Sequence, residues 1–248
     1  MSDQTKDQTL LAVDPQQRAV AEEFDQYSES YTDAVNKSLS FSGTKVDAFV
    51  EAKALDLLKF IEQRFGDPST QKILDVGCGI GNYHPYLMGK VGSITGIDVS
   101  AECVAQARKA HPGVSYDVYE GAKLPYEDDT FSVAYCICVM HHVPPAAWPA
   151  FSKELIRVVK PGGAVVVYEH NPWHPLTRKV VSDCPFDRDA VLISMPKMRT
   201  LLKDAGAPSV ETRSILTVPP LGKLASKLDA AFVRLPFGTQ YRAVAEVR

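Results

Sequence analysis

The feature that most constrains this chain is a short apolar strand that runs directly into a glycine-rich turn. Residues 73–82 have the sequence ILDVGCGIGN. Glycines at such a turn adopt backbone angles that a side chain forbids, and they let a ligand approach the backbone at the positive end of the next helix. A dinucleotide loop has glycines at its first, third and sixth places, whereas the sixth place counted from Gly77 is Asn82. No GKS or GKT follows, as a phosphate-binding P-loop requires. The turn therefore predicts a ligand-binding loop of another kind.

Around this turn, predicted strands and helices alternate along the chain. We expect strands at 72–76, 93–97, 114–119, 131–137 and 164–168, and helices at 16–35, 46–65, 82–89, 101–110 and 148–159. Continuous apolar runs such as 165–167 are typical of parallel strands covered on both faces. Two further strands are expected at 210–215 and 241–247, separated by a proline-rich insert at 217–238. The pattern predicts a doubly wound α/β fold with ligands at the carboxyl ends of its strands.

Composition excludes several classes of function. The 248 residues carry a net charge of −3 with a pI near 6.1, which lacks the positive surface that nucleic-acid binding needs. The uncharged stretch 130–152 contains three prolines and two histidines, so we expect a buried strand and a loop rather than a membrane span. Five scattered cysteines do not suggest a disulfide framework. The polar first residues show no secretory signal, and a cytoplasmic location is expected.

The pattern Asp75-x-Gly77-x-Gly79-x-Gly81 resembles the first motif of class I S-adenosylmethionine-dependent methyltransferases. The resemblance extends to Asp98, which closes the second predicted strand where the family has an acid that accepts hydrogen bonds from both ribose hydroxyls. Residues 120–126 resemble the loop that meets the adenine amino group, with Glu120 where Asp is commoner; residues 131–144 resemble the fourth motif, and KPGG at 160–163 the turn before the fifth strand. The matches follow in order from about residue 27 to residue 169.

The resemblance implies a Rossmann-like, mostly parallel seven-stranded sheet with an antiparallel C-terminal hairpin. It implies S-adenosylmethionine as cofactor, bound in a single domain over 16–248 that follows a polar start at 1–15. Within that domain, 16–66 would form N-terminal helices, 70–169 the cofactor-binding core, and 170–240 an acceptor lid and tail. The implied cofactor contacts are Tyr27, Tyr31, Asp75, Gly77, Cys78, Gly79, Asp98, Val99, Glu120, Gly121, Ala122 and Cys136. Tyr27 and Tyr31 share one helix face, so packing is their alternative role.

Candidate catalytic residues follow the fourth and fifth predicted strands, where an acceptor must approach. They are His170 first, with Asn171 and Trp173 beside it as an orienting amide and a stacking surface, and then His141 and His142. Histidine titrates near neutrality, which suits removal of a proton from a hydroxyl or amine. A structural hydrogen bond is the alternative for each. We expect no metal site, because no cysteine or carboxylate falls at metal-ligand spacing from these histidines.

The expected reaction is methyl transfer to an oxygen or nitrogen atom of a small-molecule acceptor, by a monomer or homodimer. Segments 169–178 and 184–190 resemble a bacterial branch of the superfamily that tailors small molecules or glycans. Carbon of a quinone-like or aromatic ring is the alternative acceptor. A nicotinamide-dependent oxidoreductase and a non-catalytic cofactor-binding module are the alternative classes. Arg178, Arg188 and Lys197 would favour an anionic acceptor if one of them faced the pocket.

Overall fold

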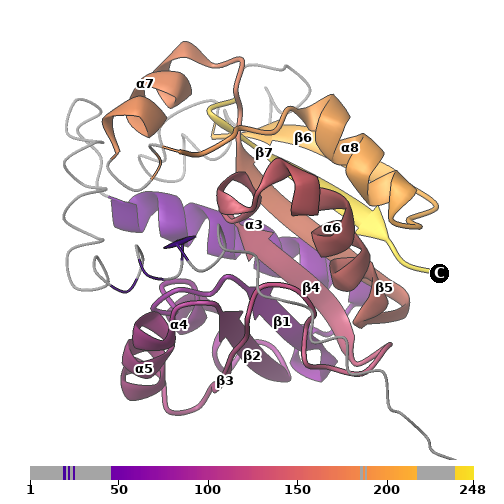
Figure 1. The fold of residues 1–248 in the computed structure, drawn as a ribbon. Coiled ribbons are helices and arrows are strands. Elements are labelled where there is room, and N and C mark those ends of the chain that lie inside the picture. The colour runs from indigo at the N-terminus through magenta and orange to yellow at the C-terminus, as the bar shows by residue number, and fades with distance from the viewer. Residues whose placement is uncertain are drawn as a thin grey trace, which may run out of the picture.

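The computed structural model describes residues 19–20, 22, 25, 46–184, 187, 189–216 and 238–248. Its strands are β1 (Lys72–Val76), β2 (Ser93–Asp98), β3 (Ser115–Val118), β4 (Phe131–Ile137), β5 (Val159–His170), β6 (Val210–Ile215) and β7 (Gln240–Glu246). They form one sheet in the order β3-β2-β1-β4-β5-β7-β6 (Figure 1). The first five strands run parallel to one another, and β7 is antiparallel to both β5 and β6. The predicted fold class is confirmed.

Helices cover both faces of the sheet (Figure 1). They are α3 (Val46–Phe65), α4 (His84–Leu87), α5 (Ala101–Ala110), α6 (Trp148–Arg157), α7 (Pro175–Asp183) and α8 (Met195–Asp204). Leu57 of α3 and Val104 of α5 pack in one apolar core, whereas Leu155 of α6 and Met198 of α8 pack in the other. Among the described residues, no helix has both the length and the apolar character needed to cross a membrane.

Several predicted boundaries differ from the structure. The helix expected over 82–89 is limited to the four residues of α4, because the glycine turn occupies the residues before it and Gly89, with a positive φ, follows. Strand β5 begins at Val159, and the KPGG segment lies in an irregular stretch of its pairing with β4. The helices α7 and α8 were not predicted. The expected helix over 16–35 and the insert over 217–238 lie largely outside the described residues.

The sheet brings one set of loops to a single edge. Because β1, β2, β4 and β5 are parallel, the segments that follow them gather at their carboxyl ends. After β4 the chain forms a short 3-10 turn, η3 (Met140–His142). Strand β7 starts at the same edge, where Gln240 pairs with His170 of β5. The glycine loop and the predicted catalytic residues therefore lie along one edge of the sheet.

Candidate active site

The glycine loop follows β1 and is anchored to β2. The backbone N–H groups of Gly77 and Cys78 both donate to the carbonyl of Ile97, at 2.8 and 3.1 Å. Gly77, Gly79 and Gly81 all have positive φ, between 51° and 78°. A Cβ on Gly77 would lie 2.5 Å from Cγ2 of Val139, whereas a Cβ on Gly79 would meet nothing within 4 Å. Gly79 therefore marks the open side of the loop, where a ligand can approach the backbone.

Asp98 ties this loop to the start of α5. Its Oδ2 accepts the backbone N–H of Gly79 at 2.7 Å, and its Oδ1 accepts that of Ser100 at 3.0 Å. Burial raises the pKa of Asp98 above its usual value, against the opposing effect of these two N–H donors. Asp98, the residue predicted to bind the ribose, thus lies beside the glycine loop, as the resemblance implies. Its contact with a ribose stays a prediction.

Buried side chains linked by polar contacts join the strand before the glycine loop to the helix after it. His84 Nε2 lies 3.1 Å from Oδ2 of Asp75, and His84 Nδ1 lies 2.5 Å from the Tyr116 hydroxyl. His84 and Asp75 are almost completely inaccessible to solvent. Asp75, predicted as a cofactor contact, is directed to His84 in the part of the chain that the structure describes. His84 was not predicted, although a carboxylate inside a buried strand indicates that it has a polar partner.

The remaining predicted cofactor residues lie at several depths. Val99 follows Asp98 and is half-buried, whereas Glu120 and Ala122 are exposed around the buried Gly121. Cys136 is fully buried within β4. Tyr27 and Tyr31 lie outside the described residues. Their neighbour Asp25 is described, and its carboxylate accepts a hydrogen bond of 2.5 Å from the Ser100 hydroxyl, which places part of the N-terminal segment beside the loop and Asp98.

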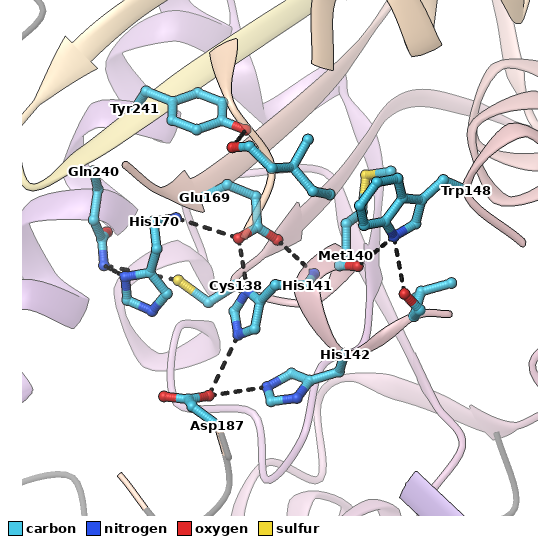
Figure 2. A network of polar contacts seen from close by, with 12 residues as sticks. Cys138, Met140, His141, His142, Trp148, Glu169, His170, Asp187, Gln240 and Tyr241 are labelled. Atoms are coloured by element: carbon cyan, nitrogen blue, oxygen red, sulfur yellow. Dashed lines mark hydrogen bonds and ion pairs between the residues drawn. The ribbon is translucent and has the colours of Figure 1, made fainter. Parts of the chain in front are cut away.

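At the ends of β4 and β5 lies a group that we call the histidine–carboxylate cluster, consisting of His141, His142, Glu169 and Asp187 (Figure 2). His141 Nδ1 lies 2.6 Å from Oε2 of Glu169. Its Nε2 lies 3.4 Å from Oδ1 of Asp187, and Nε2 of His142 lies 3.3 Å from the same oxygen. The indole of Trp148 donates to the carbonyls of Met140 and Val143, at 2.9 Å each, and so fixes the turn that carries the two histidines.

The charges of this cluster are strongly coupled. Burial opposes protonation of His141, but the carboxylates of Glu169 and Asp187 outweigh it and raise its pKa well above the usual value. Burial, reinforced by the neighbouring charge of His141, lowers the pKa of His142 to about 3. Burial alone would raise the pKa values of both carboxyls, yet the interaction with His141 lowers them. Without a bound ion, the cluster holds a charged His141 between two carboxylates and a neutral His142.

A second group surrounds Cys138, and we call it the thiol group: Lys53, Cys138, His170 and Gln240 (Figure 2 shows the last three). Lys53 Nζ and Gln240 Nε2 each donate to the Cys138 sulfur at 3.8 Å, and Gln240 Nε2 also lies 3.3 Å from Nδ1 of His170. Burial would raise the pKa of Cys138, but Lys53 and His170 lower it to about 7. Cys138 also has a φ of 58°, in a region that non-glycine residues seldom occupy. The contacts of Cys138 with Lys53 and Gln240 were not predicted.

The surroundings of His170 differ from the prediction. Asn171 was expected to orient His170, but its side-chain amide donates to the carbonyl of Gly238 and its Oδ1 accepts the backbone N–H of Trp173. Gln240 supplies the orienting amide instead, because β7 pairs directly with β5. Trp173 is largely exposed. The His141 and His170 rings lie 5.2 Å apart between centroids, so the cluster and the thiol group are neighbours.

The basic residues predicted to recognise an anionic acceptor gain no support. Arg178 and Lys197 are exposed. Arg188 lies outside the described residues.

Comparisons with known proteins agree with this geometry. A family model described as "Methyltransferase domain" matches residues 73–163, from β1 to the KPGG segment. The demethylmenaquinone methyltransferase of Streptomyces avermitilis is 30% identical over 67% of this chain and 68% of its own length. The 2-methyl-6-phytyl-1,4-hydroquinone methyltransferase of Synechocystis sp. is 37% identical over 42% of this chain, which spans only 33% of that relative.

A solved structure shares the fold over nearly the whole chain. It is a Thermotoga maritima protein described as an SAM-dependent methyltransferase and possible histamine N-methyltransferase. It superposes with a TM-score of 0.66 at 18% identity, covering 92% of this chain and all of that one.

Proposed function

The chain belongs to the class I S-adenosylmethionine-dependent methyltransferases, and from this premise we propose that it methylates an oxygen or nitrogen atom of a small-molecule acceptor. S-adenosylhomocysteine would be the second product. The glycine loop and Asp98 fit the cofactor, because Gly79 leaves open space beside a carboxylate that can accept further hydrogen bonds. When bound, the cofactor supplies an electrophilic methyl group on a good leaving group.

The main support for a proton-bearing acceptor is the gathering of three histidine rings at the acceptor edge. The His141 ring lies 4.2 Å from that of His142 and 5.2 Å from that of His170, measured between centroids. Aligning the acceptor with the methyl group supplies much of the catalysis in such displacements. An oxygen or nitrogen nucleophile must also lose its proton, and histidine accepts protons near neutral pH. Of the three rings, His170 is the one outside the histidine–carboxylate cluster, so it remains the first candidate base.

A ring carbon is the second candidate acceptor. The Streptomyces avermitilis relative is named a demethylmenaquinone methyltransferase, and the chain spans about two thirds of it. The test is methyl transfer from labelled cofactor into a panel of phenols, amines and quinols. Mass and NMR analysis of the product then shows whether the methyl group is bound to oxygen, nitrogen or carbon. Absence of transfer to all of them and to a metabolite extract would favour a non-catalytic cofactor-binding module. Cytoplasmic location and a monomeric or dimeric state stay predictions from the sequence.

Two variants of His170 test its role as base. We expect His170→Ala to lower turnover about 100-fold, the size of a general-base contribution, with unchanged affinity for S-adenosylhomocysteine. His170→Gln keeps a polar group opposite Gln240 but cannot accept a proton at neutral pH. It should therefore be as slow as His170→Ala. Full activity of the Gln variant would show that His170 only positions its neighbours.

A further inference from the structure

We propose that His141, His142 and Asp187 bind one divalent transition-metal ion, of which Zn²⁺ is the representative, at the acceptor edge of the sheet. One ligand atom from each residue lies within 4.8 Å of the other two. The three side chains converge on a common space in Figure 2, with the carboxylate of Asp187 facing both imidazole rings. These residues come from two segments far apart in the sequence, and the site exists only in the folded chain.

The spacing of the atoms is that of metal ligands rather than of strong hydrogen bonds. The two nitrogen–oxygen distances to Asp187 are 3.4 and 3.3 Å. Charge-assisted hydrogen bonds between such groups are about 2.7–2.9 Å long. Ligand atoms at about 2.0–2.1 Å from a tetrahedral zinc ion are about 3.3–3.4 Å from one another. Both distances therefore fit a shared ion, and the remaining pair of ligand atoms lies within 4.8 Å.

Glu169 prepares His141 for this role. Its Oε2 lies 2.6 Å from Nδ1 of His141, inside the fully buried end of β5. A carboxylate only accepts hydrogen bonds, so Nδ1 must carry a proton, and the neutral ring then presents the lone pair of Nε2. This lone pair faces Asp187, which is also an acceptor. Either a second proton on the His141 ring or a metal ion must therefore lie between the two. A carboxylate behind a histidine that ligates through its other nitrogen is a recurrent feature of metal sites.

The ligand set indicates the class of ion and leaves coordination positions open. Two imidazoles and one carboxylate suit zinc, iron or manganese better than magnesium or calcium, which prefer oxygen ligands. Three protein ligands leave room for an oxygen of a water or a substrate, as in catalytic sites. If the proposed methyl transfer holds, a hydroxyl of the acceptor bound there would lose its proton more readily. The ion would thus select acceptors that carry a metal-binding hydroxyl.

The expectation of no metal site rested on sequence spacing. No carboxylate stands near His141 and His142 in the sequence. Asp187 reaches them because the chain turns back after α7, where the backbone N–H of Val191 donates to the carbonyl of His141 at 2.9 Å. The proton of a charged His141 is the other cation that could occupy this space, and a binding experiment distinguishes the two.

The test is a titration of the untagged full chain, stripped with a chelator, with Zn²⁺ by calorimetry and with Co²⁺ by visible absorption. We expect one ion to bind per chain with micromolar or tighter affinity. Bound Co²⁺ should show the visible absorption of an ion with nitrogen and oxygen ligands. Asp187→Asn and His142→Gln should each weaken binding at least tenfold, and Glu169→Gln about 10- to 100-fold, because Glu169 orients the His141 ring. Asp183→Asn is the matched control, because Asp183 is an exposed carboxylate on α7 that pairs with Lys179.

Circular dichroism of each variant confirms that it folds before it is titrated. Lack of stoichiometric binding by the wild-type chain would overturn the proposal, as would equal affinities of Asp187→Asn and Asp183→Asn. A thiolate-to-cobalt charge-transfer band would overturn it too, since it would place the ion on a cysteine. Binding of S-adenosylhomocysteine is measured separately, so failure of the metal site and failure of the methyltransferase proposal remain distinguishable.

Discussion

The part of the site built on β1 and β2 and the part built on β4 and β5 differ in how they are held. We call the first, residues 75–100, the cofactor half, and its hydrogen bonds join the glycine loop to the adjacent strand and to Asp98. The second, the acceptor half, consists of the histidine–carboxylate cluster and the thiol group. It draws side chains from α3, η3, β5, β7 and the segment after α7. A local motif builds the first half, and only the complete tertiary fold builds the second.

The difference teaches where function can vary within one fold. Most hydrogen bonds of the cofactor half are made by backbone groups of the glycine loop or by Asp98. We therefore expect this half to tolerate little change in the glycines and Asp98. The acceptor half depends on side chains from loops and chain segments that scaffold strands position, and such segments commonly carry specificity. The cofactor half therefore identifies the family, and the acceptor half holds the information about the substrate.

The largest effect that separates the halves is expected from Asp98→Ala. Each hydrogen bond to a carboxylate contributes about 1.5–3 kcal/mol, so loss of two ribose contacts should weaken S-adenosylhomocysteine binding by about 100-fold or more. Calorimetry measures this, with Asp128→Ala as control, since Asp128 is an exposed carboxylate that pairs with Arg157. Binding of Zn²⁺ should not change. An affinity within threefold of wild type would remove Asp98 from the ribose site.

A smaller effect is expected inside the cofactor half, where Gly77 and Gly79 are compared. Alanine at either position must adopt a positive φ, at a cost of about 1–2 kcal/mol in the free energy of unfolding. Gly77→Ala should cost at least about 1 kcal/mol more, because its Cβ would clash with the stiff Val139 side chain. Urea unfolding measures both.

The double variant Gly77→Ala/Val139→Ala isolates the clash. Its loss in free energy of unfolding should be about 1 kcal/mol smaller than the sum of the losses in the two single variants. Equal costs at the two glycines, with no coupling to Val139, would show that the loop needs glycine at position 77 for its backbone angles alone.

The smallest effect concerns the acceptor half and is a pH dependence. The pKa of Cys138 is lowered from 9.0 to about 7, so its thiolate stabilises the fold fully above the unfolded pKa, and this contribution disappears as the pH falls through 7. The pH profile of Cys138 alkylation, followed by mass spectrometry, should therefore have a midpoint near 7. Lys53→Met should raise that midpoint by about one pH unit.

The control for this profile is Lys59→Met, which removes an exposed lysine from the same helix. It should leave the midpoint unchanged. A wild-type midpoint near 9, or identical profiles for the two lysine variants, would contradict the influence of Lys53 on Cys138.

The same comparison explains which parts of the fold and of the site can be predicted from the sequence. The seven strands and the glycine loop follow from apolar runs and glycine spacing, which are local signals, and the bounds of α3, β1, α5 and β4 agree with the prediction. The helix α8 was missed although Ser194 and Pro196 are a readable start signal. The partnerships of Gln240 with His170 and of Asp187 with His141 could not be predicted, because they depend on β7 and on the turn after α7.

The placement of β7 has a consequence for the synthesis of this protein. Strands β1 to β5 can pair as they leave the ribosome, but β6 is separated from β5 until β7 enters between them. A nascent chain interrupted before residue 240 would expose the edge of β5 and leave β6 without its neighbour, and an exposed strand edge invites aggregation. It would also lack Gln240 beside His170. Formation of β7 thus completes the sheet and the acceptor half together. We therefore expect a chain that stops before β7 to aggregate rather than to act as a weak enzyme.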